Sequence, residues 1–241
     1  PRAYGVVGLG GWARTLAFNQ PVDTNKSVGY TSGMAFAIQL ELAARPLAFF
    51  LDNFAAGFFL RLRFQATIGL SSTLENTAET ISTSMSQFIL DTGYQLNILG
   101  GASSPILEFN LGYGMLDFSV DWPDSVTTNK TPGAAYRFVL LGVGASYPFV
   151  RLLDGKMPLK GMVRFDYRFV LDAGEITGEP DPGHGPGSVG GLALTLGLKS
   201  GYADFLFGLE YTYTRFFYSF TDGESRAASG LPAAGGALDQ M

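Results

Sequence analysis

The feature that most constrains this chain is an alternation of large apolar residues with small or polar ones at every second position. Between residues 34 and 43 the odd positions hold alanine, glutamine or glutamate, and the even positions are Met34, Phe36, Ile38, Leu40 and Leu42. Successive side chains of a β-strand point to opposite faces. This period therefore predicts a strand with one large apolar face and one small or polar face.

The same period recurs along most of the chain. It predicts nine strands, at about Tyr4–Phe18 and within 34–43, 58–70, 87–98, 107–121, 136–147, 159–169, 192–199 and 204–213. The parity of the alternation reverses near Met115 and again before Val143. A reversal within one strand indicates a β-bulge, because one extra residue moves every later side chain to the other face.

The predicted connections alternate in length. Long, polar connections are expected at 19–32, 71–84, 122–132 and 172–188, and shorter ones at 100–104, 151–158 and 199–203. Long loops on one rim and short turns on the other are typical of barrels in the bacterial outer membrane, whose long loops lie outside the cell. The connection Ala44–Gly57 belongs to the short-turn rim, but it is long and apolar.

Composition separates this chain from ordinary soluble domains. Apolar residues make up 46% and charged residues 15%, against roughly 25% charged residues in a typical soluble domain. No apolar run approaches the roughly 20 residues that a membrane helix needs. The net charge of −5 argues against a basic face for nucleic acid. The absence of cysteine is consistent with an exported protein.

The alternation is best explained by a barrel in a membrane. The smaller face carries too little apolar bulk to form a sandwich core, and a closed barrel pairs every backbone group within the protein, as lipid requires. Aromatic residues gather near the predicted strand ends, as at Tyr147, Phe149 and 216–220, which fits interfacial girdles. A soluble lipocalin-like barrel, with its apolar face turned inward around a ligand, is the alternative.

By its alternation, loop asymmetry and aromatic strand ends, nearly the whole chain resembles the small outer-membrane β-barrel proteins of Gram-negative bacteria. The resemblance implies one all-β domain over 1–241, a transmembrane up-and-down antiparallel barrel of about 10 strands, with eight as the alternative. It also implies a location in the bacterial outer membrane, among outer-membrane lipid and lipopolysaccharide, without a cofactor. Such barrels have an even strand number and often end in an aromatic residue, so either a closing strand follows Met241 or the count of nine is wrong.

Charged residues on the polar face are the candidate functional residues. They are Glu41, Arg61, Arg63, Asp91, Glu108, Arg137, Lys160, Arg164, Asp166, Arg168, Lys199, Asp204 and Glu210. We expect them to pair across strands and plug a narrow lumen, which predicts a non-enzymatic structural or assembly component of the envelope. The alternative is a small pore, which the excess of arginine and lysine would make anion-preferring.

A third function class is an outer-membrane lipid-modifying enzyme. The chain has a single histidine, His184, in a loop rich in proline and glycine, which is a poor platform for a positioned base. Glu179, Asp181 and His184 are not spaced as a diagnostic metal site. We therefore predict no catalytic residues and no metal.

The Ala44–Gly57 turn concentrates large apolar residues where water or lipid headgroups are expected. Leu47, Phe49, Phe50 and Leu51 are predicted to form a docking surface for another envelope protein or a second barrel. The alternative is that the turn dips into the membrane interface.

Overall fold

The computed structural model describes residues 2–21, 30–51, 54–68, 71–73, 80–100, 104–121, 133–152, 157–177, 186–202, 205–221 and 234–241. Within these ranges the chain is all-β apart from three short 3-10 helices. The strands are β1 (Ala3–Trp12), β2 (Thr15–Pro21), β3 (Tyr30–Thr31), β4 (Ala35–Ala44), β5 (Phe58–Ile68), β6 (Ser71–Thr73), β7 (Thr80–Asn97), β8 (Ile106–Asp121), β9 (Ala134–Leu152), β10 (Met157–Asp172), β11 (Gly187–Tyr202), β12 (Phe205–Phe220) and β13 (Ala234–Gln240).

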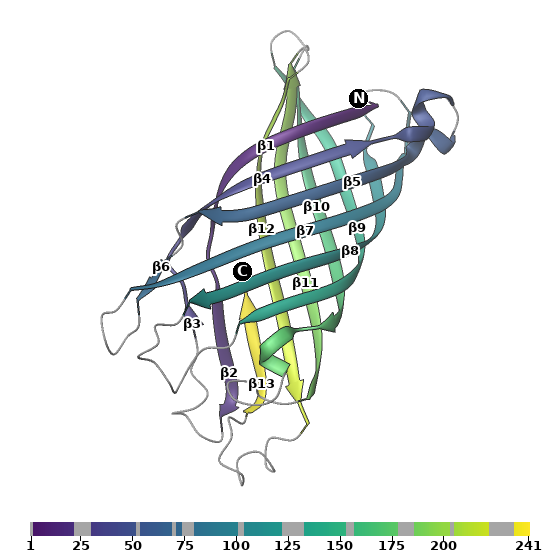
Figure 1. Ribbon diagram of the computed structural model, residues 1–241. Helices are drawn as coiled ribbons and strands as arrows, with labels where there is room; N and C mark the ends of the chain where they lie inside the picture. Colours follow the sequence, from purple (N-terminus) through teal and green to yellow (C-terminus); the bar gives the residue numbers. More distant parts are fainter. Residues whose placement is uncertain are drawn as a thin grey trace.

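All thirteen strands belong to one sheet, in the order β1-β4-β5-β7-β8-β9-β10-β11-β12-β13-β2-β3, with β6 paired to β7. Every pairing is antiparallel and the long strands follow one another in chain order, as an up-and-down arrangement requires (Figure 1). Because β3 and β6 are only two and three residues long, eleven longer strands remain. The prediction of about ten strands is therefore close, but it is not the observed count.

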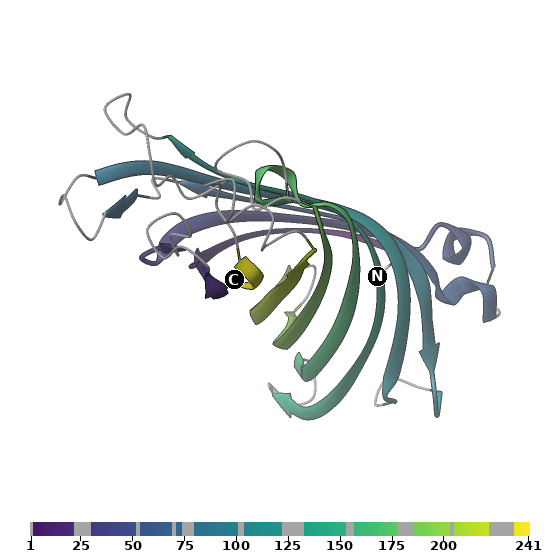
Figure 2. The same ribbon diagram turned by 90° about the horizontal axis from the view of Figure 1, so that it is seen from below.

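The sheet curls back onto itself through its N-terminal strands. β1 and β2 are separated only by Ala13 and Arg14, yet β1 pairs with β4 whereas β2 pairs with β13 from the other end of the chain. Seen from below, the C-terminus lies beside the first strands of the chain (Figure 2), where β13 pairs with β2. The result is a half-open barrel, paired around its circumference at the long-loop end only.

The outer surface is apolar, as the alternation predicts. The outward side chains with at least a third of their surface exposed include Phe36, Leu42, Phe58, Leu60, Phe109, Leu111, Phe165, Phe169, Leu196 and Leu209. Their sequence neighbours Arg61, Asn110 and Arg164 are buried inside the curve. The assignment of the two faces is thus confirmed for β4, β5, β10 and β11.

The two parity reversals are not bulges. The register between β7 and β8 runs from Ser82–Asp121 to Asn97–Ile106 without a shift, and the register between β8 and β9 is equally regular. Instead, the side chains that we expected to face lipid at this end turn inward. Leu116, Phe118, Tyr136, Phe138 and Leu140 are all buried, with 2% or less of their surface exposed.

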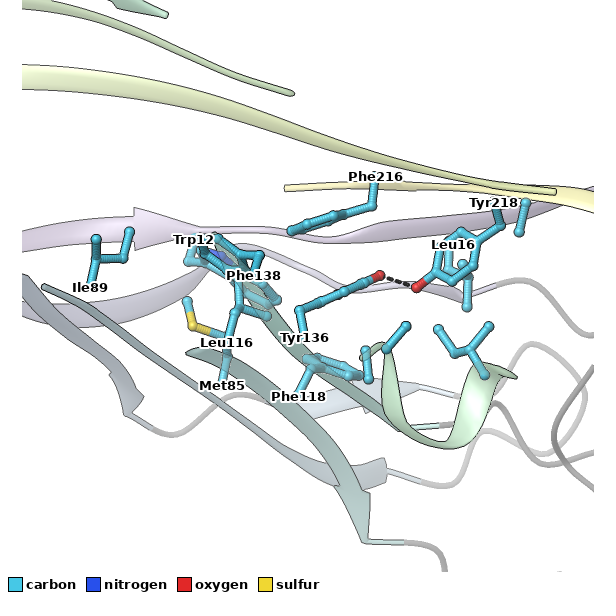
Figure 3. Close-up of a cluster of buried hydrophobic side chains, with 14 of the residues drawn as sticks. Trp12, Leu16, Met85, Ile89, Leu116, Phe118, Tyr136, Phe138, Phe216 and Tyr218 are labelled. Atoms are coloured by element: carbon cyan, nitrogen blue, oxygen red, sulfur yellow. Dashed lines mark hydrogen bonds between the residues drawn. The ribbon is translucent and has the colours of Figure 1, made fainter. Parts of the chain in front are cut away.

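These inward residues form an apolar core inside the long-loop half of the barrel (Figure 3). Trp12 and Leu16 from the N-terminal strands, Met85 and Ile89 from β7, and Phe216 from β12 complete it. The ring of Tyr136 stacks on that of Phe216 at a centroid distance of 3.8 Å. The lumen therefore has two zones, one near the long loops that is mainly apolar and aromatic, and one towards the short turns that holds most of the charges.

The short-turn connection between β4 and β5 contains two single-turn 3-10 helices, η1 (Pro46–Phe49) and η2 (Phe54–Gly57). A third, η3 (Gly174–Thr177), follows β10 at the opposite rim and buries Ile176. Pro46 at the start of η1 supplies the fixed backbone angle that favours a first helical position. In the part of the chain that the structure describes, no helix is long and apolar enough to cross a membrane.

Candidate functional site in the lumen

Four of the predicted charges meet at the wall formed by β5, β7 and β8. The Arg61 guanidinium donates from Nε to Asp91 Oδ1 at 3.2 Å and lies 2.9 Å from Glu108 Oε1. Arg63 reaches the same Asp91 carboxylate at 3.5 Å. The pairing follows from the register, because Arg61 lies directly opposite Asp91 in the β5–β7 ladder. Both side chains of the Arg61–Asp91 pair are almost fully buried.

Three more charges come from alternate positions of β10 across the lumen. Arg164 Nε lies 3.3 Å from Asp166 Oδ2. The Arg168 guanidinium lies over the rings of Phe138 and Phe216, at 4.7 and 5.5 Å from their centroids. Arg63 is within electrostatic range of Arg164 and Asp166, so the two walls face each other. We call these seven residues the lumen network: Arg61, Arg63, Asp91, Glu108, Arg164, Asp166 and Arg168.

Glycine makes room for the lumen network in β9. A Cβ atom on Gly142 would lie 2.1 Å from Asp166 Oδ1 and 2.4 Å from Asn110 Oδ1. No real side chain tolerates such distances, so the absence of a side chain at Gly142 lets two polar groups from β8 and β10 approach its backbone. The interior is packed here rather than open.

A smaller set of charges lies towards the short-turn rim. The Tyr4 hydroxyl donates to Glu41 at 2.9 Å, and Lys199 Nζ lies 2.7 Å from Glu210 Oε1. Lys199 also lies 3.9 Å from Glu41, which joins β11 to β4 across the lumen. These contacts link the two walls near the short-turn rim.

The most deeply buried ion pair was missed by sequence reasoning. Arg14, between β1 and β2, donates from Nε and Nη2 to the two carboxylate oxygens of Asp239 in β13, both at 2.8 Å. Both side chains have no solvent exposure. The Tyr136 hydroxyl also donates to Asp239, and the Tyr218 hydroxyl donates to Tyr136 (Figure 3). We call these four residues the closing cluster, because they join both ends of the chain to β9 and β12.

A signal for Arg14 is present in the sequence. Arg14 shares its parity with Trp12 and Leu16, which both face the apolar core. A charge on an inward apolar face requires a buried partner. The short segment that carries Asp239 is rich in glycine and alanine and was not predicted to be a strand. Asp239 was therefore not identified as the partner of Arg14.

The structure corrects one of the predicted lumen residues and leaves others untested. Arg137 points outward and pairs with Asp117 at 2.7 Å, because Tyr136 and Phe138 on either side of it fill the core. Lys160 is half-buried and lies opposite Lys199 in the β10–β11 register. Asp204 and the loop residues Glu179, Asp181 and His184 lie outside the described residues.

Two hollows lie among the described residues. A small, partly open one of about 20 Å³ lies between Arg2, Tyr4, Arg45 and Gln95 near the short-turn rim, which is room for about one water molecule. A wider and more open one of about 380 Å³ is lined mainly by Leu60, Leu90, Leu111 and Val139. No group of three or more histidine, cysteine, aspartate or glutamate side chains able to hold a metal occurs within the described ranges.

The apolar turn between β4 and β5 is exposed. Leu47, Phe49, Phe50 and Leu51 have between 38% and 85% of their surface accessible, and the neighbouring Phe54 has 82%. Sequence reasoning had not included Phe54 in this surface.

Comparison with known proteins finds no relative of this chain. No protein-family model matches it, and no curated protein or solved structure matches it.

Proposed function

We propose that this protein is an outer-membrane barrel with a sealed lumen, which serves the envelope as a structural or assembly component. The supporting observation is the inversion of the usual pattern of burial. Large apolar side chains such as Phe109, Leu111 and Leu196 are exposed on the outer face of the sheet. Arg61, Asp91 and Arg164 are buried on its inner face. Water would disfavour this arrangement, whereas a lipid environment favours it.

Two barriers in series support the sealed lumen. The lumen network fills the middle of the interior with charged side chains, most of them in ion pairs, and the apolar core fills the long-loop half. Displacing either would break buried ion pairs or expose aromatic side chains, and both changes cost several kcal/mol. A barrel of roughly 8 strands has an interior that side chains just fill, and this one, with eleven longer strands, is only somewhat wider.

We expect the purified protein to give no steady single-channel currents in planar lipid bilayers, because both barriers close the path for ions. The measurement is conductance at fixed voltage in symmetric potassium chloride, with insertion confirmed by heat-modifiable gel migration of the same preparation. Robust, steady currents would contradict the sealed lumen and favour the second candidate, an anion-preferring pore.

One observation favours that second candidate. The lumen network holds four arginines (Arg61, Arg63, Arg164, Arg168) against three carboxylates (Asp91, Glu108, Asp166), so it carries one excess positive charge (4 − 3). A pore through it would therefore attract anions. If currents are found, their reversal potential in a salt gradient reports this preference.

We further propose that the turn around η1 and η2 docks an envelope partner. Phe49 and Phe50 are exposed at the short-turn rim, and burying each would contribute about 1.5–3 kcal/mol before ordering costs are subtracted. Replacing both with serine is expected to leave folding intact and to abolish co-purification of a partner. Failure of the variant to insert, or retention of every partner seen with the wild type, would contradict docking.

A further inference from the structure

Three arginines of the lumen network carry buried nitrogen atoms that find no hydrogen-bond acceptor among the described residues. These atoms are Nε and Nη2 of Arg63, Nε of Arg164, and Nε and Nη1 of Arg168. Arg164 and Arg168 are buried as whole residues, with 6% and 3% of their surface exposed. A buried charged donor without an acceptor is strongly unfavourable. These five groups therefore require an acceptor in the lumen.

The three arginines converge from two walls of the barrel. Arg164 and Arg168 lie at inward positions of β10, and Arg63 reaches towards them from β5. Arg63 is within electrostatic range of Arg164, and Arg168 is within electrostatic range of both. Because repulsion between like charges is strong where water is excluded, the region between the three guanidinium groups favours a negative charge.

The neighbouring carboxylates supply only part of that charge. Asp91 already accepts from Arg61, and it lies 3.5 Å from Arg63, which is too long for a good hydrogen bond. Asp166 lies 3.3 Å from Arg164 Nε, but that nitrogen makes no hydrogen bond within the described ranges. Two carboxylates, one of them shared with Arg61, therefore face the three arginines.

The carboxylates nearer the short-turn rim are engaged elsewhere. Glu41 is within electrostatic range of Arg63, but it accepts from Tyr4 and lies 3.9 Å from Lys199. Glu210 lies 2.7 Å from the same lysine. These two carboxylates balance a lysine at the rim, so they leave the charge on the arginines in the middle of the lumen largely uncompensated.

The amide of Asn110 does not meet the need either. Its Oδ1 atom and the Oδ1 atom of Asp166 both lie beside Gly142 and are both without a donor in the described part of the chain. Turning the amide over brings Nδ2 of Asn110 towards Asp166, so these two side chains can satisfy each other. The arginine donors remain.

We propose that Arg63, Arg164 and Arg168 bind one halide ion, which completes the lumen network. A halide accepts several N–H groups at once and cancels a positive charge. A water molecule brings donors as well as acceptors and no net charge, so it matches a site made of donors less well. The site uses only the inner face of the sheet and therefore does not depend on whether the outer face lies in lipid.

The packing around the arginines favours a small anion. A Cβ atom at Gly114 would lie 2.3 Å from the ring of Phe138, on which Arg168 rests, and one at Gly142 would lie 2.1 Å from Asp166. Such close packing disfavours a phosphate ester or a sugar. An ion of one atom, such as chloride, fits these surroundings better.

Chloride-dependent unfolding tests the site in the protein refolded in detergent. Chloride replaces gluconate at constant ionic strength, and urea unfolding is followed by tryptophan fluorescence. An ion that binds only the folded protein lowers the unfolding equilibrium constant roughly tenfold for each tenfold rise in chloride above the dissociation constant. We expect this dependence for the wild type, and we expect bromide to act in the same way.

Two variants separate the site from a general effect of salt. Arg168→Met removes one arginine but keeps apolar contact with Phe138 and Phe216, and it should lose the chloride dependence. Arg137→Met is the matched control, because Arg137 points outward and pairs with Asp117, and it should keep the dependence. A wild-type unfolding constant that does not change with chloride, or an equally steep dependence in both variants, would overturn the site.

Crystals of the wild type grown in sodium bromide give a second test, which needs no variant to fold. We expect an anomalous difference peak in contact with the side-chain nitrogen atoms of Arg63, Arg164 and Arg168. Density at this place without an anomalous signal would show water there and contradict the proposal. Because neither measurement applies a voltage, their failure leaves the conductance prediction untouched, and steady currents would leave the halide site untouched.

Discussion

Replacing Asp239 with alanine is expected to lower the free energy of unfolding by about 3–5 kcal/mol, because it leaves a buried arginine without its counter-charge. Arg14 and Asp239 are both inaccessible to solvent, and Asp239 is also the acceptor for the Tyr136 hydroxyl. The variant therefore removes two interactions at once. Urea unfolding of the protein refolded in detergent, followed by tryptophan fluorescence, measures the change.

A double variant separates the ion pair from packing. Arg14→Met combined with Asp239→Leu removes both charges and keeps apolar volume, and such replacements of buried pairs are often neutral or stabilising. We expect the double variant to recover most of the stability that Asp239→Ala loses. A double variant as unstable as the single one would show that the charge on Arg14 is not the cause.

Asp117→Ala is the matched control for a surface ion pair. Asp117 pairs with Arg137 at 2.7 Å, but the two side chains are 47% and 30% exposed. This pair lies close to the long-loop rim, beside the first residues of β9, and exposed pairs contribute about 0–1 kcal/mol, so the loss should be correspondingly small. Equal losses for Asp117→Ala and Asp239→Ala would contradict the closing cluster as the joint between the two ends of the chain.

The alternation of residues was enough to predict most of the longer strands, their antiparallel order and most of their faces. In β5, for example, Leu60 and Arg61 alternate so strongly that only one orientation buries the charge. The observed register places Arg61 directly opposite Asp91, so the two buried charges pair. The two faces of these strands could be predicted because neighbouring residues differ strongly in polarity.

In β9 neighbouring residues differ little in polarity, so the sequence does not indicate which large residues face lipid. Leu140 and Leu141 are adjacent and equally apolar, yet Leu140 is buried in the core and Leu141 is 56% exposed. The assumption that every large residue faces lipid predicted Arg137 to lie in the lumen. It also required bulges that the observed register does not contain. The long-loop half of the lumen is itself apolar, and periodicity alone carries no sign of this.

The strand β13 was missed for a different reason. The segment of β13 is built from glycine and alanine around Leu238 and Asp239, so it lacks the β-branched and aromatic residues that mark strands. It becomes a strand because β12 and β2 on either side supply hydrogen-bond partners. The Arg14–Asp239 pair, separated by most of the chain length, depends on this tertiary context.

Under the proposed membrane location the outer face of the sheet lies in lipid, and Leu196 in the middle of β11 is a suitable reporter. Leu196 is 48% exposed on the outer face, whereas Asp121 at the end of β8 is exposed at the long-loop rim. Because the native chain has no cysteine, Leu196→Cys and Asp121→Cys each provide a single site for a fluorescent bimane label.

The most direct measurement is quenching of these two labels after the protein has folded into phospholipid vesicles. We predict that lipids brominated in the middle of their acyl chains quench the label at position 196 and that aqueous iodide does not reach it. The label at position 121 should show the reverse. Iodide quenching at position 196 as strong as at position 121, without quenching by brominated lipid, would place the outer face in water and contradict the account.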